Sequence, residues 1–258
     1  MQSNKMNRYI ANIILKFNKR LFFLIFLFFS IATNTIAQSS EIGTWNILNI
    51  KYNHSKDLSM FAEGQIRSLQ FYDNFHYHEL KFGANYSVHK NVKLTLGAGS
   101  YQTYNEVGNF RLPKNNDEFR LWPQVVFFQD ISGLKVEQRY RMEMRWTSNG
   151  YRNRFRYRLG FSYPFGKEVN GYKPFQISVN NELFFTDKEP FFERNRAQVA
   201  LNFKSSKHTT LQLGYLHQFD YRINDEIGRD FLVVGYYYEI FRKSSTKSSN
   251  GEYELKDN

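Results

Sequence analysis

Apolar and polar residues alternate with a period of two along most of the chain past Ser40. The clearest example runs from Leu134 to Thr147, where the odd positions are charged up to Arg145 and the even positions are apolar or aromatic apart from Gln138. Successive side chains of a β-strand point to opposite faces of the sheet, so this alternation is typical of a strand with one apolar and one polar face. In a helix the same residues would scatter charge around the axis. We therefore predict a strand over 134–147.

Ten further segments show the same alternation. The predicted strands are 42–53, 57–70, 75–88, 92–105, 117–130, 134–147, 151–163, 174–186, 192–204, 209–222 and 229–241. Most are much longer than the usual globular strand of about 5–6 residues, and a strand that crosses a bilayer needs about 9–11 residues. The longest predicted loop is 105–116, and residues 242–258 are predicted to form a disordered polar tail.

These strands predict an all-β fold, an antiparallel transmembrane β-barrel of 10–12 strands. Eleven segments are counted, whereas bacterial single-chain barrels have even strand numbers, so either one strand near 101–120 is missed or one segment is spurious. A soluble lipocalin-like barrel with its apolar face inside also explains the alternation. The membrane is favoured by the strand lengths and by large rings near strand ends, where aromatic girdles mark the interfaces. The rings assigned to the outer face are Tyr101, Tyr104, Trp146, Tyr151, Tyr163, Phe165, Phe184, Phe185, Phe219, Tyr221 and Tyr236 to Tyr238.

Residues 1–37 have the pattern of a secretory signal peptide. Five basic residues precede an apolar run that begins at Leu21, and Thr35-Ile36-Ala37 supplies small residues at the cleavage positions. A membrane-anchor helix is the alternative, but it needs about 20 apolar residues. Cleavage near Ala37 predicts a mature barrel over 38–241 in the cell outer membrane. It also removes five cations and no acid, so the net charge falls from +11 to +6.

Composition narrows the class of protein further. The 258 residues include no cysteine, which excludes a disulfide scaffold, an iron–sulfur cluster and a cysteine nucleophile. An aromatic content of 18% argues against disorder, and a mean hydropathy of −0.59 argues against a helical membrane protein. A barrel accounts for both values, because half of each strand faces lipid and the other half a charged lumen. We expect outer-membrane lipid as a partner, no nucleic acid, and a monomer.

The polar face carries the candidate chemistry. If Asn149-Gly150 is a two-residue turn, the strands on either side form a hairpin whose charges lie on one side of the sheet. The opposite pairs predicted across this turn are Arg145–Arg154, Glu143–Arg156 and Arg141–Arg158, and those across Ile131-Ser132 are Glu118–Arg145 and Arg120–Glu143. The predicted lumen charge cluster is Glu118, Arg120, Glu137, Arg139, Arg141, Glu143, Arg145, Arg152, Arg154, Arg156 and Arg158, with Glu63, Gln65, Arg67, Arg194, Arg196 and Gln198 expected beside it.

Two interpretations of this cluster remain open. Ion pairs between arginines and glutamates can be purely structural, or the excess of arginine can form a constriction that binds or passes small anionic solutes. We expect no catalytic residues, no cofactor and no metal, since His76 and His78 lack a carboxylate partner of clear spacing. The prediction is therefore a non-enzymatic structural barrel or narrow pore. The alternative is a barrel-embedded enzyme or accessory subunit acting on lipid or envelope polysaccharide.

Three stretches resemble a known family. They are Val136 to Trp146, Asn153 to Leu159 and Leu211 to Gln218, and Gly43-Thr44-Trp45 and Glu63 to Arg67 are similar to the family's opening strands. The family is the outer-membrane proteins grouped as domain-of-unknown-function family 2490, and the resemblance covers roughly 41–241. It implies a secreted β-barrel of the Gram-negative outer membrane and implies no activity.

Overall fold

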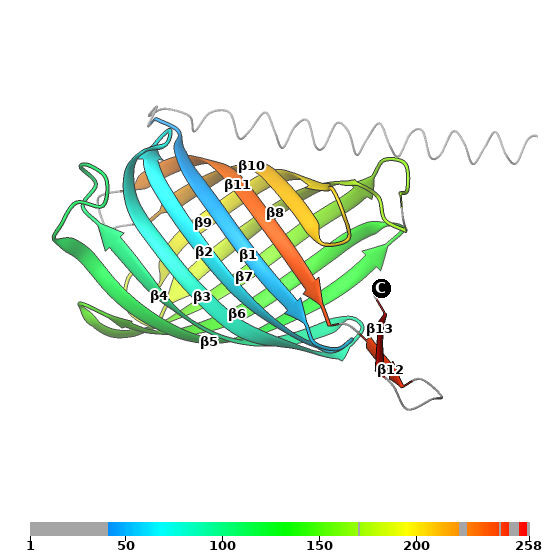
Figure 1. The fold of residues 1–258 in the computed structure, drawn as a ribbon. Coiled ribbons are helices and arrows are strands. Elements are labelled where there is room, and N and C mark those ends of the chain that lie inside the picture. Colours follow the sequence, from blue (N-terminus) through cyan, green and yellow to red (C-terminus); the bar gives the residue numbers. More distant parts are fainter. Residues whose placement is uncertain (1–40, 170, 222–225, 243, 248–252, 257–258) are drawn as a thin grey trace, which may run out of the picture. The chain divides into compact units, whose positions relative to one another are not determined.

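Eleven long strands form one closed β-barrel (Figure 1). The computed structural model describes residues 41–169, 171–221, 226–242, 244–247 and 253–256. The predicted signal peptide, 1–37, lies outside the described residues. Among those described, no helix is long and apolar enough to cross a bilayer.

The prediction of an all-β barrel of 10–12 strands is confirmed. The strands are β1 (Gly43–Asn53), β2 (Leu58–Gln70), β3 (Asp73–His89), β4 (Val92–Tyr104), β5 (Lys114–Ile131), β6 (Leu134–Thr147), β7 (Gly150–Phe165), β8 (Phe175–Thr186), β9 (Phe192–Lys204), β10 (Thr209–Asp220) and β11 (Ile227–Phe241). Every predicted segment agrees with its strand to within three residues at either end. Within the predicted polar tail, β12 (Ser244–Lys247) pairs with β13 (Tyr253–Lys256) as a separate two-stranded antiparallel sheet.

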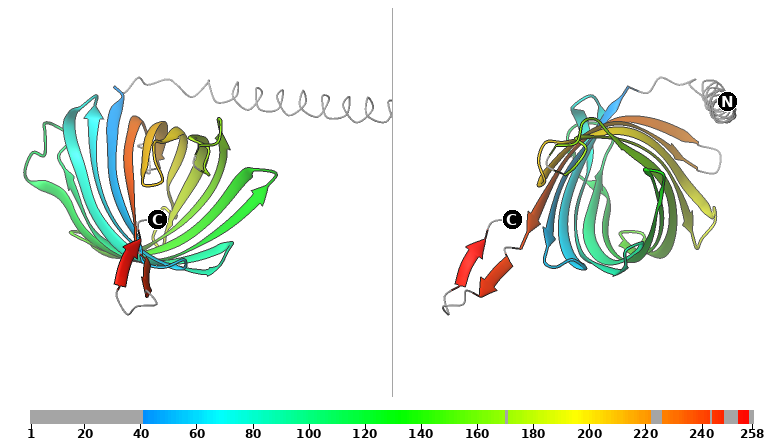
Figure 2. Two further views of the ribbon diagram at one scale, coloured as in Figure 1. Left: turned by 45° about the vertical axis from the view of Figure 1, so that its right-hand side comes forward. Right: turned by 90° about the vertical axis from the view of Figure 1, so that its right-hand side faces the viewer.

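The barrel closes with an odd number of strands. Consecutive strands pair antiparallel, and β1 pairs parallel with β11 from Gly43↔Phe231 to Asn53↔Phe241 (Figure 2, right). The expectation of an even number was therefore wrong: the eleven predicted segments are the eleven strands of the barrel in the described part of the chain. A parallel ladder also satisfies the backbone donors and acceptors of both edge strands, so the ring closes without a twelfth strand.

The predicted pairing of the charged strands is wrong by two residues. The structure pairs Arg145 with Arg152, Glu143 with Arg154, and Arg141 with Arg156, and it pairs Arg120 with Arg145. A shift of two keeps every side chain on its predicted face, because the period of a strand is two.

The turn geometry explains this shift. Gly150 has a φ of 102° and pairs with Thr147, so Ser148-Asn149 are the turn residues and Gly150 takes the left-handed position that follows them. At the other end of the hairpin strands, Ser132 (φ 54°) and Gly133 (φ 88°) form the turn between Ile131 and Leu134. We call the two ends of the barrel the Gly150 end and the Gly133 end.

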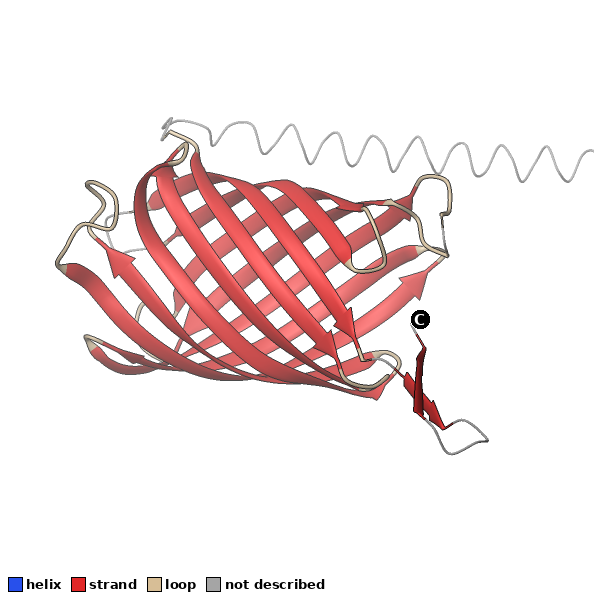
Figure 3. Cartoon of the chain, in the orientation of Figure 1, coloured by secondary structure: helices blue, strands red, loops and turns tan. Residues whose placement is uncertain are grey.

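The outer and inner faces differ sharply in chemistry. The strands run tilted around the wall of the barrel (Figure 3). Exposed apolar side chains cover its outer face, among them Leu80, Phe82, Leu96 and Leu213. Many of the predicted outer rings are exposed there, namely Trp146, Tyr151, Tyr163, Phe165, Phe185, Tyr236 and Tyr238. Three predicted outer rings instead point into the lumen: Tyr101 and Phe184 are buried under arginines, and Tyr237 donates to Gln212.

Glycines on the inner face make room for rings that lie flat against the wall. Phe61, Gly83, Gly97 and Trp122 are direct neighbours across β2 to β5. A Cβ added at Gly97 would lie 2.5 Å from Trp122 Cε2, and one added at Gly83 would lie 2.8 Å from Phe61 Cε1. These two glycines therefore fix the position of the aromatic side chains inside the barrel.

We expect Gly97→Ala to lower the free energy of unfolding by about 1–3 kcal/mol, because the added methyl group overlaps the Trp122 ring. The displaced indole should also change the tryptophan emission of the folded protein. Denaturant unfolding of the purified protein measures both effects. Gly64→Ala is the matched control, since a Cβ there meets nothing within 4 Å. Equal stability of the two variants would contradict the assigned packing.

Candidate functional site

The inner face of the barrel carries the predicted charge cluster. Ten of its eleven residues line one cavity of about 1710 Å³, and the eleventh, Glu143, is fully buried beneath the arginines. The six residues expected beside the cluster line the same cavity: Glu63, Gln65, Arg67, Arg194, Arg196 and Gln198. Alternation in eleven strands thus brings side chains far apart in sequence to one lumen.

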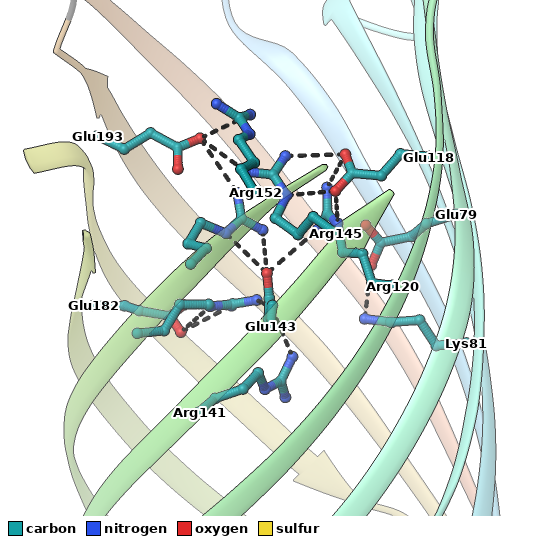
Figure 4. A network of polar contacts seen from close by, with 12 residues as sticks. Glu79, Lys81, Glu118, Arg120, Arg141, Glu143, Arg145, Arg152, Glu182 and Glu193 are labelled. Carbon is teal, nitrogen blue, oxygen red and sulfur yellow. Dashed lines mark hydrogen bonds and ion pairs between the residues drawn. The ribbon is translucent and has the colours of Figure 1, made fainter. Parts of the chain in front are cut away.

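Glu143 lies at the centre of the ion-pair network (Figure 4). Arg154 donates to its Oε2 through Nε (2.8 Å) and Nη2 (2.5 Å), and Arg156 Nη1 donates to its Oε1 (2.5 Å). Arg120 and Arg141 lie farther away, at 3.8 and 3.6 Å. One buried carboxylate therefore neutralises part of the charge of four guanidiniums.

Glu118 accepts bidentate bonds from two arginines. Arg120 donates through Nε (2.6 Å) and Nη2 (2.9 Å). Arg145 donates through Nε to Oε1 and through Nη2 to Oε2 (2.9 Å). Arg120 and Arg145 are directly opposite each other in the sheet, an unfavourable arrangement for like charges. The shared carboxylate offsets that repulsion.

Two further carboxylates, Glu182 and Glu193, were missed by the sequence analysis. Glu182 Oε1 accepts from Arg139 (2.5 Å) and Arg156 (2.9 Å). Glu193 Oε1 lies within 4 Å of three arginines of the cluster, which are Arg145, Arg152 and Arg154. Glu182 lies on β8 and Glu193 on β9. Both contact the arginines because of the order of the strands in the barrel, which no local sequence pattern indicates.

The loop before β9 is hydrogen-bonded to Asn153 of β7 through Asp187. The backbone and side-chain amides of Asn153 donate to Asp187 at 3.1 and 2.8 Å. These hydrogen bonds favour the charged carboxylate and hold the pKa of Asp187 below its usual value. The attachment keeps the start of β9, and with it Glu193, beside the arginines of β7.

Aromatic rings cover several guanidiniums. Arg67 Cζ lies 3.4 Å from the ring centroid of Trp45 and 4.1 Å from that of Tyr77. Arg196 Cζ lies 4.8 Å from the centroids of both Trp45 and Phe184. Cations over ring faces gain electrostatic attraction that grows when water is excluded. The inward rings therefore stabilise arginines that have few carboxylate partners.

A ring of buried side chains lines the lumen toward the Gly150 end. Every strand contributes one buried inward residue to it, and we call this set the belt. The belt consists of Trp45, Arg67, Tyr77, Tyr101, Arg120, Glu143, Arg154, Phe184, Arg196, Gln218 and Val233. On the Gly133 side of the belt, the inward residues include half-buried ones, such as Lys93, Arg139 and Asn180, and buried ones, such as Thr95 and Val126. In the belt, by contrast, all eleven residues are buried.

The cavity reaches both ends of the barrel. Its lining includes Arg152 and Lys188 at the Gly150 end and Lys90 and Lys135 at the Gly133 end. The cavity is large and polar enough to hold small solutes, and its lining carries eighteen arginines and lysines against eleven carboxylates, an excess that favours anions.

Fold and lumen together define the class: a closed β-barrel with an apolar outer wall and an arginine-rich interior. A family model described as "Protein of unknown function (DUF2490)" matches residues 42–228, and the chain belongs to this family. The family resemblance drawn from the sequence is thereby confirmed over those residues. An uncharacterized protein of Methylorubrum extorquens is 26% identical over 169 residues, which cover 63% of this chain and 72% of that protein.

Proposed function

We propose that this protein spans the outer membrane of a Gram-negative cell as a monomeric β-barrel and forms a narrow, anion-selective pore. Residues 1–37 would direct export and be removed by cleavage near Ala37. The distribution of charge over β6 and β7 carries the proposal: all of their charged side chains lie on the inner face, and their outer face holds apolar residues apart from Gln138 and Asn153. Lipid tails favour such a wall, and water favours such an interior.

The charge balance of the lumen supports anion selectivity. β6 and β7 carry eight cations and two carboxylates, and the whole cavity is lined by eighteen arginines and lysines and eleven carboxylates. Rings of arginine or lysine lower the energy of an anion in a pore and raise that of a cation. The buried side chains of the belt lie across the lumen, so small solutes are the expected cargo.

A barrel-embedded enzyme acting on lipid or envelope polysaccharide is the second candidate, and one observation favours it. His217 Nδ1 lies 2.7 Å from Asp230 Oδ1 on the outer face, and the Tyr215 hydroxyl donates to the same oxygen (2.5 Å). In a catalytic triad, however, the nucleophilic hydroxyl contacts the second imidazole nitrogen rather than the acid. The pore is therefore the better supported proposal.

Planar-bilayer recordings test the pore. Under a KCl gradient, we expect a reversal potential that shows greater permeability to chloride than to potassium. Arg152→Gln combined with Arg158→Gln should reduce that preference, because these two guanidiniums are among the more accessible in the network. Lys167→Gln, in the β7–β8 loop and away from the cavity lining, is the control. Absence of conductance, or preference for potassium, would refute the proposed function.

A further inference from the structure

The lumen on the Gly133 side of the belt contains a wall of amide side chains. They belong to Gln176, Asn180, Gln198, Asn202 and Gln212, on β8 to β10, and we call them the amide wall. Asn180 donates to Gln198 (3.2 Å), and Gln212 donates to Asn202 (2.8 Å). Each amide offers two donors and an oxygen acceptor, so these bonds leave part of its capacity unused. Among the described residues, Asn180 Oδ1 and Gln198 Nε2 have no hydrogen-bond partner.

Three cations share one row across the sheet. They are Lys93, Arg139 and Arg158, with Val126 between the lysine and the first arginine, and Arg158 is next to β8, where the amide wall begins. Arg139 and Arg158 each form an ion pair with a single carboxylate, Glu182 (2.5 Å) and Glu137 respectively. Lys93 Nζ lies 4.9 Å from the Phe128 ring centroid, and within the described part of the chain it has no carboxylate within 4 Å. The row therefore presents to the cavity one lysine without a carboxylate partner among the described residues and two arginines that each share one carboxylate.

The amide wall and the cationic row are adjacent. Gly160 pairs with Asn180, which pairs with Gln198, and Gly160 follows Arg158 by one inward position on β7. Successive inward positions on a strand are about 7 Å apart. Gly160 has no side chain, and the nearest atoms to a Cβ added there would be Asn180 Cβ, at 3.6 Å, and Glu137 atoms, at 3.9 Å. The glycine leaves a recess between the charged and amide-bearing surfaces.

From this juxtaposition we infer that the Gly133 side of the lumen binds a small polyhydroxylated anion of the sugar phosphate class. The cationic row matches a phosphate group, which arginine and lysine both recognise through charge and hydrogen bonds. Amides both donate and accept, as hydroxyl groups do, so the amide wall matches the sugar. The inference rests on the proposed pore and names the solute that it would admit.

The belt defines the direction of entry. Glu143 and Phe184 are fully buried in it, whereas the amide wall and the cationic row are half-buried. A solute entering at the Gly133 end would reach the cationic row before the belt. The cavity, about 1710 Å³, exceeds the 300–1,000 Å³ of common small-molecule sites.

Calorimetric titration of the purified full-length protein in detergent tests the inference with three probes: glucose 6-phosphate, glucose and inorganic phosphate. We expect glucose 6-phosphate to bind about tenfold more tightly than either of the other two, since only it engages both surfaces. Gln198→Leu should weaken the binding of glucose 6-phosphate and leave the affinity for inorganic phosphate unchanged. Lys93→Gln should weaken the binding of both glucose 6-phosphate and inorganic phosphate. It breaks no ion pair within the described residues, so we expect this variant to fold normally. Lys167→Gln is the control.

Equal affinities for glucose 6-phosphate and inorganic phosphate would overturn the inference, as would a Gln198→Leu variant that binds all three probes normally. The proposed pore would survive either result if bilayers still show anion selectivity. Conversely, selective binding without conductance would support this site and refute the pore.

Discussion

A Glu143→Gln variant is expected to lose about 3–5 kcal/mol of unfolding free energy, because removing one partner of a buried ion pair leaves the other charges uncompensated. Glu143 is fully buried and accepts from Arg154 and Arg156, with Arg120 and Arg141 within 4 Å. Glutamine keeps the shape of the side chain, removes its charge and replaces one acceptor oxygen by a donor NH2 group. Denaturant unfolding in micelles, followed by tryptophan emission, measures the change.

Glu137→Gln is the matched control for this experiment. It removes the same charge from the same strand, but the Glu137–Arg158 pair is about a third exposed, at 32% and 27%. Exposed pairs contribute about 0–1 kcal/mol, so the control should stay close to the unmodified protein. If both variants lose the same stability, Glu143 is not the centre of the network.

The second large effect is expected on the outer wall. Leu80 lies near the middle of β3 and is 62% exposed, facing outward. In a phospholipid bilayer, Leu80→Arg should lower the free energy of unfolding by about 2–4 kcal/mol, the range for arginine near the midplane on the lipid face of a barrel. Reversible unfolding in lipid vesicles measures this cost. In a water-soluble barrel the same substitution would be nearly neutral.

Val107→Arg supplies the comparison for the outer wall. Val107 is equally exposed, at 68%, but lies in the β4–β5 loop, outside the strands. Arginine in a loop remains hydrated, so we expect little change in stability there. A difference between the two variants indicates a lipid-facing wall, whereas equal, small effects indicate a wall that faces water.

Period-two alternation was enough to predict the eleven strands of the barrel and the face of each residue in the predicted charge cluster. It could not predict which residues lie opposite one another, because Gly150 follows its turn instead of forming part of it. An error of two residues changes every partner and leaves every face unchanged. The faces of β6 and β7 were therefore predicted correctly, although their predicted ion pairs were not.

The sequence pattern could not predict which aromatic rings face inward, or which carboxylates from other strands contact the arginines of β6 and β7. Tyr101 and Phe184 read as apolar positions, yet both lie under arginines, and cation–π contact makes a ring compatible with a charged lumen. Glu182 sits on a polar position of its own strand, whereas Glu193 reaches the arginines through the register shift between β8 and β9 at Phe184/Phe185. Their arginine partners become evident only when β6 to β9 are neighbours in the barrel.

The account depends most on the barrel lying in the outer membrane, and cell fractionation tests this directly. The full chain is expressed in a Gram-negative host, and its envelope is separated on a sucrose gradient and washed at high pH. We predict that the protein stays in the outer-membrane fraction after the wash and is released only by detergent. Recovery in the soluble periplasmic fraction would contradict the account.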